Sequence, residues 1–293
     1  MPEPTTPIRL AVLIDADNTS AKHASVLLEE VARYGVPTVK RAYGDWTTQN
    51  LVGWKDELNR HAITPVQQFS YTTGKNSTDS AMIIDTMDLL YTGNLDAYAI
   101  VSSDSDFTRL VTRLRESGKT VYGLGRRRTP AALVAACDKF IFLEVIARGD
   151  SSTPEDQGGA AAGAEEEPGG DAAPLPDLDT ILVAAVEATS GDDNWSRLDA
   201  VGSYLSTRHA SFDPRNYGYS KLGAMVRAQD VVEVEERTGQ PHVRLRAPAT
   251  ETPTETPTAP ATRPRRTRKS AASGAGGSGG GSGRASGKGA GGA

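Results

Sequence analysis

Leu10-Ala-Val-Leu-Ile-Asp-Ala-Asp-Asn18 is the segment most indicative of the fold, and Ala99-Ile-Val-Ser-Ser-Asp-Ser-Asp-Phe107 repeats its pattern. In each stretch a short apolar run gives way abruptly to acidic residues. Such runs predict buried strands, here over residues 9–14 and 98–101. Ligands of open parallel sheets bind beyond the carboxyl ends of the strands, so the acids of both stretches are expected to meet in one crevice.

The surrounding sequence alternates strand and helix signals, which predicts an α/β fold with a parallel sheet covered by helices on both faces. Further strands are expected over residues 38–42, 64–67, 120–124 and 140–143. Helices are expected over residues 20–34, 49–61, 78–90 and 105–117, with a polar loop at 70–78.

Charge is strongly segregated along the 293 residues, although the net charge is only −5. Residues 1–149 carry 17 acids and 17 bases, whereas residues 150–176 carry 7 acids and no base. Residues 177–247 have a net charge of −3, and residues 248–293 have one of +5. We therefore expect an α/β domain (1–149), an acidic flexible linker (150–176), a second domain (177–247) and a disordered basic tail (248–293).

The second ordered segment has the outline of a small winged-helix domain. Helices are expected over residues 178–189, from Trp195 and Leu198 onward, and over 219–228. Two β-rich stretches then flank Thr238-Gly239, which is a typical hairpin turn signal.

Other features limit the protein's class. No run of 18 apolar residues exists, so a membrane span is not expected, and the N-terminus lacks the features of a signal peptide. The single cysteine, Cys137, cannot form an internal disulfide, and a cytoplasmic location fits best. We interpret Cys137 as a small buried apolar residue.

The acids themselves predict a metal site. Several carboxylates in one crevice repel each other unless a cation lies among them. Oxygen-only ligands suit Mg²⁺ or Mn²⁺ better than zinc. The candidate ligands are Asp15, Asn18, Asp79, Asp104 and Asp106.

The same acids allow other interpretations. One of Asp15, Asp17 and Asn18 is expected to cap the helix that follows, and Asp104 or Asp106 can do the same for the next one. Asp15 and Asp17 also resemble the nucleophile and general acid of haloacid-dehalogenase-type phosphatases. Gly74-Lys75 is not a phosphate-binding P-loop, because Phe69 and Asn76 stand where that motif needs Gly and Ser or Thr.

Three motifs together resemble the NYN domains, a PIN-like nuclease branch. They are Ile14-Asp-Ala-Asp-Asn18, Lys75-Asn-Ser-Thr-Asp79 and Ser102-Ser-Asp-Ser-Asp-Phe107. The resemblance covers residues 8–145 and implies a PIN-like Rossmannoid sheet with a Mg²⁺ or Mn²⁺ site that hydrolyses RNA. It implies metal binding by the four acids Asp15, Asp79, Asp104 and Asp106, with Asn18 positioning metal or phosphate. Lys75 is placed to hold a phosphate, whereas Asp17 and Asp85 match less constrained positions.

The segment around Trp195–Leu205 and Phe212–Leu222 resembles the OST-HTH (LOTUS) domain, a winged-helix module. This resemblance implies binding of single-stranded or structured RNA, or docking of a protein partner. We therefore expect a cytoplasmic metal-dependent ribonuclease. A non-catalytic RNA-binding adaptor with the same fold is the alternative from another functional class.

Overall fold

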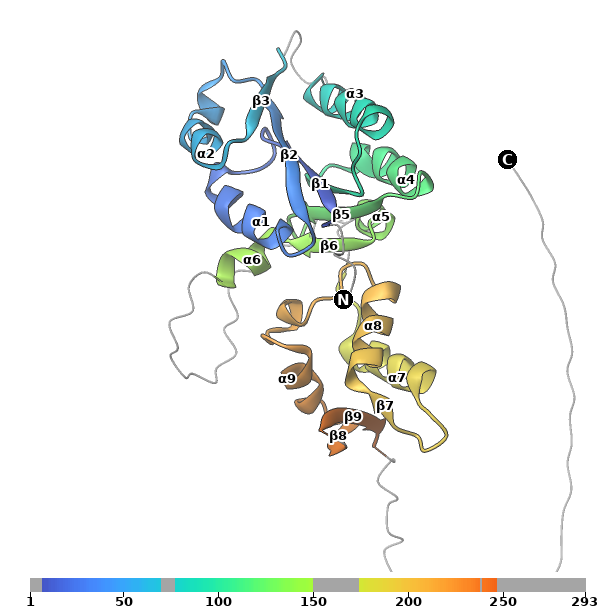
Figure 1. The fold of residues 1–293 in the computed structure, drawn as a ribbon. Helices are drawn as coiled ribbons and strands as arrows, with labels where there is room; N and C mark the ends of the chain where they lie inside the picture. Colours follow the sequence, from blue (N-terminus) through green and yellow to red (C-terminus); the bar gives the residue numbers. More distant parts are fainter. Residues whose placement is uncertain (1–6, 70–76, 150–173, 238, 247–293) are drawn as a thin grey trace, which may run out of the picture. The chain divides into compact units, whose positions relative to one another are not determined.

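The computed structural model describes residues 7–69, 77–149, 174–237 and 239–246. The first half is built on a six-stranded sheet whose neighbouring strands are all parallel (Figure 1). The strand order is β3-β2-β1-β4-β5-β6. The bounds are β1 (Arg9–Asp15), β2 (Val36–Gly44), β3 (Thr64–Gln67), β4 (Ala97–Val101), β5 (Thr120–Gly125) and β6 (Lys139–Phe142). The expected α/β fold with a parallel sheet is confirmed.

The two strands that carry the acidic motifs lie side by side at the centre of this sheet. Leu10 to Ile14 of β1 pair with Ala97 to Val101 of β4, and all of these residues are buried. Burial on both faces explains why both strands read as continuous apolar runs instead of alternating ones. The strand order reverses between β1 and β4, which is where open α/β sheets bind their ligands.

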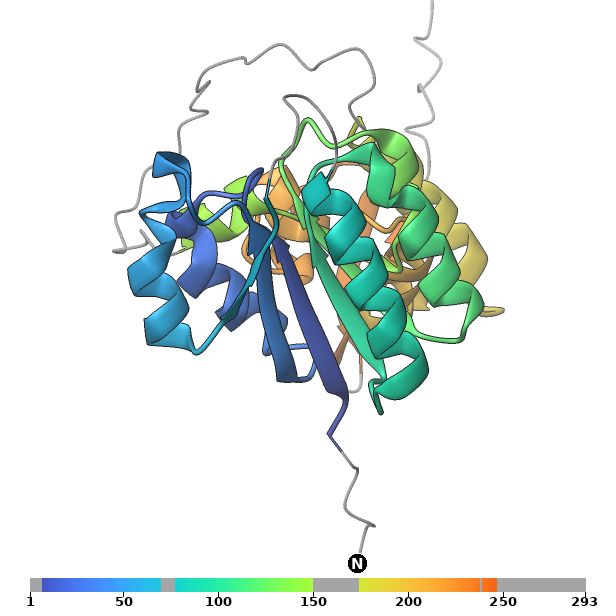
Figure 2. The same ribbon diagram turned by 90° about the horizontal axis from the view of Figure 1, so that it is seen from above.

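Helices cover both faces of the sheet (Figure 2). One face carries α1 (Ala24–Val31), α2 (Trp54–His61) and α6 (Leu143–Gly149), and the other carries α3 (Ser77–Thr92), α4 (Thr108–Glu116) and α5 (Ala131–Ala136). Side chains of these helices complete one apolar core on each side. Cys137 is buried in the second of these cores.

Two helices lie where no helix signal was found in the sequence. They are α5 and α6, which span 6 and 7 residues. Elements this short contain fewer than two turns, so their apolar residues do not establish a helical period. The expected helix over 20–34 is also divided, because the 3₁₀ turn η1 (Ala21–His23) precedes α1.

The later described residues form a separate set of elements around their own core. These elements are α7 (Leu178–Thr189), β7 (Ser196–Arg197), α8 (Leu198–Arg208), η4 (Pro214–Tyr217), α9 (Leu222–Arg227), β8 (Val232–Arg237) and β9 (Gln240–Leu245). The strands form an antiparallel sheet in the order β7-β9-β8. The expected small winged-helix domain is confirmed.

Two local details of this domain differ from expectation. Trp195 does not open a helix, because Ser196 and Arg197 pair with β9 before α8 begins. The third helix begins at Leu222 instead of residue 219, since Gly218 is left-handed (φ 86°) and Lys221 is extended. Within the described ranges, no helix combines the length and apolarity needed to cross a membrane.

Candidate metal centre

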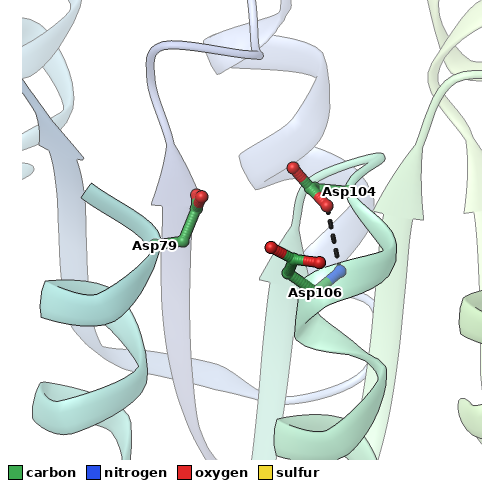
Figure 3. Close-up of side chains that lie close together, drawn as sticks. All are labelled: Asp79, Asp104 and Asp106. Carbon is green, nitrogen blue, oxygen red and sulfur yellow. Dashed lines mark hydrogen bonds between the residues drawn. The ribbon is translucent and has the colours of Figure 1, made fainter. Parts of the chain in front are cut away.

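Three carboxylates meet beyond the carboxyl end of β4. Asp79 lies in the first turn of α3, and Asp104 and Asp106 lie in and beside η3 (Ser105–Phe107), which follows β4. One oxygen from each carboxylate lies within 4.8 Å of the others (Figure 3). The structure therefore brings together three of the five residues selected from the sequence as metal ligands.

A short hydrogen-bonded turn shapes the loop after β4. Ser102 is buried, and its Oγ accepts a hydrogen bond from the backbone N–H of Asp104 (3.1 Å). Asp104 Oδ1 in turn accepts the backbone N–H of Asp106 (2.9 Å) and so caps η3. The capping interpretation is thus correct for Asp104. It does not compete with a metal role, because a carboxylate has a second oxygen and further lone pairs.

The pKa of Asp79 shows that several negative charges lie close together at this site. Its side chain is buried, and burial together with the negative charges of Asp15, Asp104, Asp106 and Asp17 raises its pKa to about 6. In the absence of a cation, acids at this spacing are held together against their mutual repulsion. A divalent ion among them would relieve that repulsion.

Asp15 lies at the end of β1 and is only 1 % exposed. Its carboxylate accepts hydrogen bonds from the backbone N–H (3.2 Å) and side-chain Nδ2 (2.8 Å) of Asn18, and from Ser102 Oγ (2.8 Å). Burial raises its pKa, while these hydrogen bonds act in the opposite direction. Asp15 is not one of the three carboxylates within 4.8 Å, but it links the β1 and β4 loops through Ser102.

The interpretation of a cap near Asp15 is wrong. The residue preceding η1 is Ser20, the residue preceding α1 is His23, and neither helix start receives a side-chain cap. Asp17 instead accepts a hydrogen bond from Thr78 Oγ1 (2.8 Å) and thereby holds the start of α3 beside the β1 loop.

Gly44, the last residue of β2, lies close to the side chain of Asp17. A Cβ at this position would lie 2.5 Å from Leu51 Cδ1 and 3.1 Å from Asp17 Oδ1.

Asp85 lies six residues after Asp79 on α3 and has different partners. It pairs with the guanidinium of Arg41 and accepts a hydrogen bond from the hydroxyl of Tyr43, both on β2. Burial and this hydrogen bond raise the pKa of Tyr43. Asp85 therefore fastens α3 to the sheet. Lys75, the expected phosphate contact, lies outside the described residues.

Sequence reasoning overlooked three polar residues at this edge. Ser102 joins Asp15 to Asp104, and Ser103 Oγ accepts the backbone N–H of Arg126 (2.8 Å). The Ser-Ser pair directly before Asp104 was a usable signal, because hydroxyls at a strand end commonly bond to the following backbone. Nothing in the local sequence indicated that Arg126, just after β5, would reach the same loop.

The chemistry available here is that of a hard cation site. Asp79, Asp104 and Asp106 offer only oxygen, the donor type that suits Mg²⁺ and Mn²⁺. The position agrees with this, because the acids lie at the switch point between β1 and β4. The residues present therefore fit a divalent cation.

Comparisons with protein families match both halves of the chain. A model described as the NYN domain matches residues 9–144, and one described as the OST-HTH/LOTUS domain matches residues 173–244. The uncharacterized protein MJ0482 of Methanocaldococcus jannaschii is 27% identical over 123 residues, which cover 40% of this chain and 47% of that protein. The chain thus spans about half the length of this curated relative.

Two solved structures also match parts of the chain. A protein of unknown function from Vibrio parahaemolyticus matches with 17% identity and a TM-score of 0.42, covering 48% of this chain and 95% of that one. A fragment of a Chromobacterium violaceum protein matches with 35% identity and a TM-score of 0.23, covering 28% of this chain and 92% of that one.

Proposed function

Because the chain carries an NYN domain followed by an OST-HTH/LOTUS domain, we propose that it is a metal-dependent ribonuclease that hydrolyses RNA phosphodiesters. Both domains point to a function connected with RNA. The observation that carries the catalytic proposal is the meeting of Asp79, Asp104 and Asp106, with one oxygen from each within 4.8 Å of the others.

Mg²⁺ or Mn²⁺ is the proposed cofactor, held by Asp79, Asp104 and Asp106, with Asp15 and Asn18 completing the set. Asp15 Oδ1 accepts one hydrogen bond and keeps a lone pair that can face a cation, whereas Oδ2 accepts two, from Asn18 and Ser102. Asn18 Nδ2 donates to Asp15, which leaves the amide oxygen of the same side chain to face a cation. When bound, the ion would activate water for in-line attack and neutralise charge on the nonbridging oxygens.

The chain's own residues prepare this reaction. Ser102 orients Asp15 and the Asp104 loop together, so that carboxylates from two strands keep a fixed separation. Asp17 holds the start of α3, which positions Asp79 opposite that loop. Lys75, in the segment just before α3, is proposed as a phosphate contact. The OST-HTH domain is proposed to select the RNA or to bind a protein partner.

A phosphatase of the haloacid-dehalogenase type is the rival enzyme class. It would need Asp15 as an accessible nucleophile and Asp17 as a general acid. Asp15 is 1 % exposed and accepts three hydrogen bonds, and Asp17 accepts one from Thr78. These contacts favour the ribonuclease. An RNA-binding adaptor remains the non-catalytic alternative, although it has no need of a carboxylate group that is costly to keep together.

A manganese titration followed by thermal unfolding tests whether the acids bind a metal. A ligand that binds only the folded state at about 100 times its Kd stabilises that state by about 2.7 kcal/mol. We expect the melting temperature of the wild type to rise with Mn²⁺ and that of Asp104→Asn to rise far less. Asp88→Asn, an exposed change on α3, is the matched control and should respond like the wild type. Equal shifts in all three proteins would contradict the proposed metal site.

A further inference from the structure

The loop after β5 places arginines at the same edge of the sheet as the carboxylates. Arg126, Arg127 and Arg128 follow Gly125, the last residue of β5, and β5 pairs with β4. Parallel strands end at a common edge, so the arginines emerge beside the loop that carries Asp104 and Asp106. None of these arginines belongs to the proposed metal site.

Arg126 forms hydrogen bonds with both loops that carry the acids. Its backbone N–H donates to Ser103 Oγ (2.8 Å) in the β4 loop, and its guanidinium donates to the carbonyl oxygen of Asn18 (3.3 Å) in the β1 loop. Gly125 permits this approach, because a Cβ there would lie 2.7 Å from the carbonyl oxygen of Ser102. One hydrogen bond to a carbonyl leaves most of the five guanidinium N–H groups for another acceptor.

Lys22 adds a further positive charge from η1. Burial lowers the pKa of His23, the positive charges of Lys22 and Arg126 act in the same direction, and Glu144 opposes them. The two cations are therefore within electrostatic reach of one imidazole. Lys22 and Arg128 are exposed. Among the described residues, no ion pair involves Lys22, Arg126 or Arg128.

Arg127 behaves differently from its neighbours. Its guanidinium lies over the ring of Phe142, 5.4 Å from the ring centroid, and its backbone N–H donates to Glu144. Arg127 therefore contacts β6 and the start of α6 and is not counted among the charges at the site edge. The group at the site edge, which we call the cationic rim, consists of Lys22, Arg126 and Arg128.

We propose that the cationic rim binds a backbone phosphate of single-stranded RNA next to the phosphodiester that is cleaved. This inference rests on the proposed ribonuclease function. A metal ion would neutralise the scissile phosphate and the acids around it, but the neighbouring phosphates of the strand need counter-charges of their own. Arginine suits this role because its planar fork donates two hydrogen bonds to a phosphate. Contacts of this kind position the strand without reading its bases.

The salt dependence of RNA binding tests the rim. Binding of a labelled single-stranded RNA to the full chain is measured by fluorescence anisotropy in EDTA, where no metal-dependent cleavage occurs. Each phosphate neutralised on a single strand contributes a slope of roughly 0.7 to log K against log salt. For Arg126→Gln/Arg128→Gln we expect the slope to fall by roughly 0.7, the contribution of the one phosphate that the rim binds, with weaker binding at low salt. Arg126→Lys/Arg128→Lys keeps both charges and should keep most of the slope.

The matched control removes two exposed arginines from the opposite edge. Arg33 and Arg60 lie at the helix ends that lead into the starts of β2 and β3, and their side chains are 66% and 64% exposed. Arg33→Gln/Arg60→Gln should leave the slope unchanged. The proposal is overturned if the rim variant keeps the wild-type slope, if the control loses as much, or if the wild type binds no RNA. A wild type that binds through the rim yet cleaves no RNA in Mn²⁺ would instead overturn the proposed function alone.

Discussion

Asp79 lies in an environment unlike that of an ordinary surface aspartate. Its pKa rises from an ordinary 3.8 to about 6 because burial and four nearby acids disfavour its charged form. The folded chain consequently binds the Asp79 proton more tightly than the unfolded chain does. This stabilising contribution is complete below about pH 4 and is lost as the pH rises through about 6.

This shift predicts a specific pH dependence for the metal-free protein. Asp79→Asn removes the titrating group, so its unfolding free energy relative to wild type should rise between pH 4 and pH 7. Chemical denaturation of both proteins in EDTA across this range measures the difference. Asp88→Asn serves as the control. A difference between Asp79→Asn and wild type that does not change with pH would show that the acids do not interact strongly.

At the scale of elements, the placement of α3 decides whether Asp79 meets the other carboxylates. Two contacts hold this helix: Thr78 donates to Asp17 at its start, and Asp85 binds Arg41 and Tyr43 further along. Asp85 is partly buried, with 25% of its side chain exposed. We expect Asp85 to anchor the helix and to take no part in the proposed metal site.

Asp85→Asn should therefore destabilise the fold without abolishing metal binding. Weakening a partly buried, charge-assisted interaction costs about 1–3 kcal/mol. Tyr43→Phe, which removes one hydrogen bond to the same carboxylate, should cost about 1 kcal/mol. Denaturant unfolding measures both losses, and the Mn²⁺-induced rise in melting temperature should persist in both variants. An Asp85→Asn protein of wild-type stability that no longer responds to Mn²⁺ would assign Asp85 to the metal site instead.

The same elements show which parts of the fold and site could be predicted from the sequence and why other parts could not. β1 and β4 are buried on both faces, and their continuous apolar runs therefore predicted them as strands. The acids that follow these runs predicted the edge of the sheet where Asp104 and Asp106 lie. α5 was not predicted because six residues are too few to establish a helical period in the sequence. The contacts of Ser102 with Asp15 and of Arg126 with Asn18 join residues 87 and 108 positions apart, which no local pattern encodes.

At the scale of the whole molecule, the described residues form apolar cores in two separate stretches of chain. Two cores flank the parallel sheet, and a third is made only of residues from α7 onward. The intervening acidic segment, residues 150–176, carries 7 acids and no base. Its composition predicts a flexible linker between independently stable domains, with a boundary at each end of that segment.

Limited proteolysis tests this division of the chain. Cleavage should occur first within residues 150–176 and leave two fragments that resist further digestion, because each fragment keeps its own core. Mass spectrometry identifies the fragments, and circular dichroism of each isolated fragment shows whether it remains folded. Digestion that destroys one half as soon as the segment is cut would show that the two halves depend on each other.

We propose that the carboxylates of Asp79, Asp104 and Asp106 hold a metal that cleaves RNA. The decisive measurement is the cleavage rate of a single-stranded RNA by wild type and Asp104→Asn, with Mn²⁺ varied to saturation. Loss of an outer contact to a metal ligand usually costs about 10–100-fold, so removing a ligand charge should cost more than about 100-fold. Asp88→Asn, purified in parallel to control for contaminating nuclease, should cleave like wild type, and RNA binding should persist in all three. Cleavage by Asp104→Asn at the wild-type rate in saturating Mn²⁺ would contradict the claim.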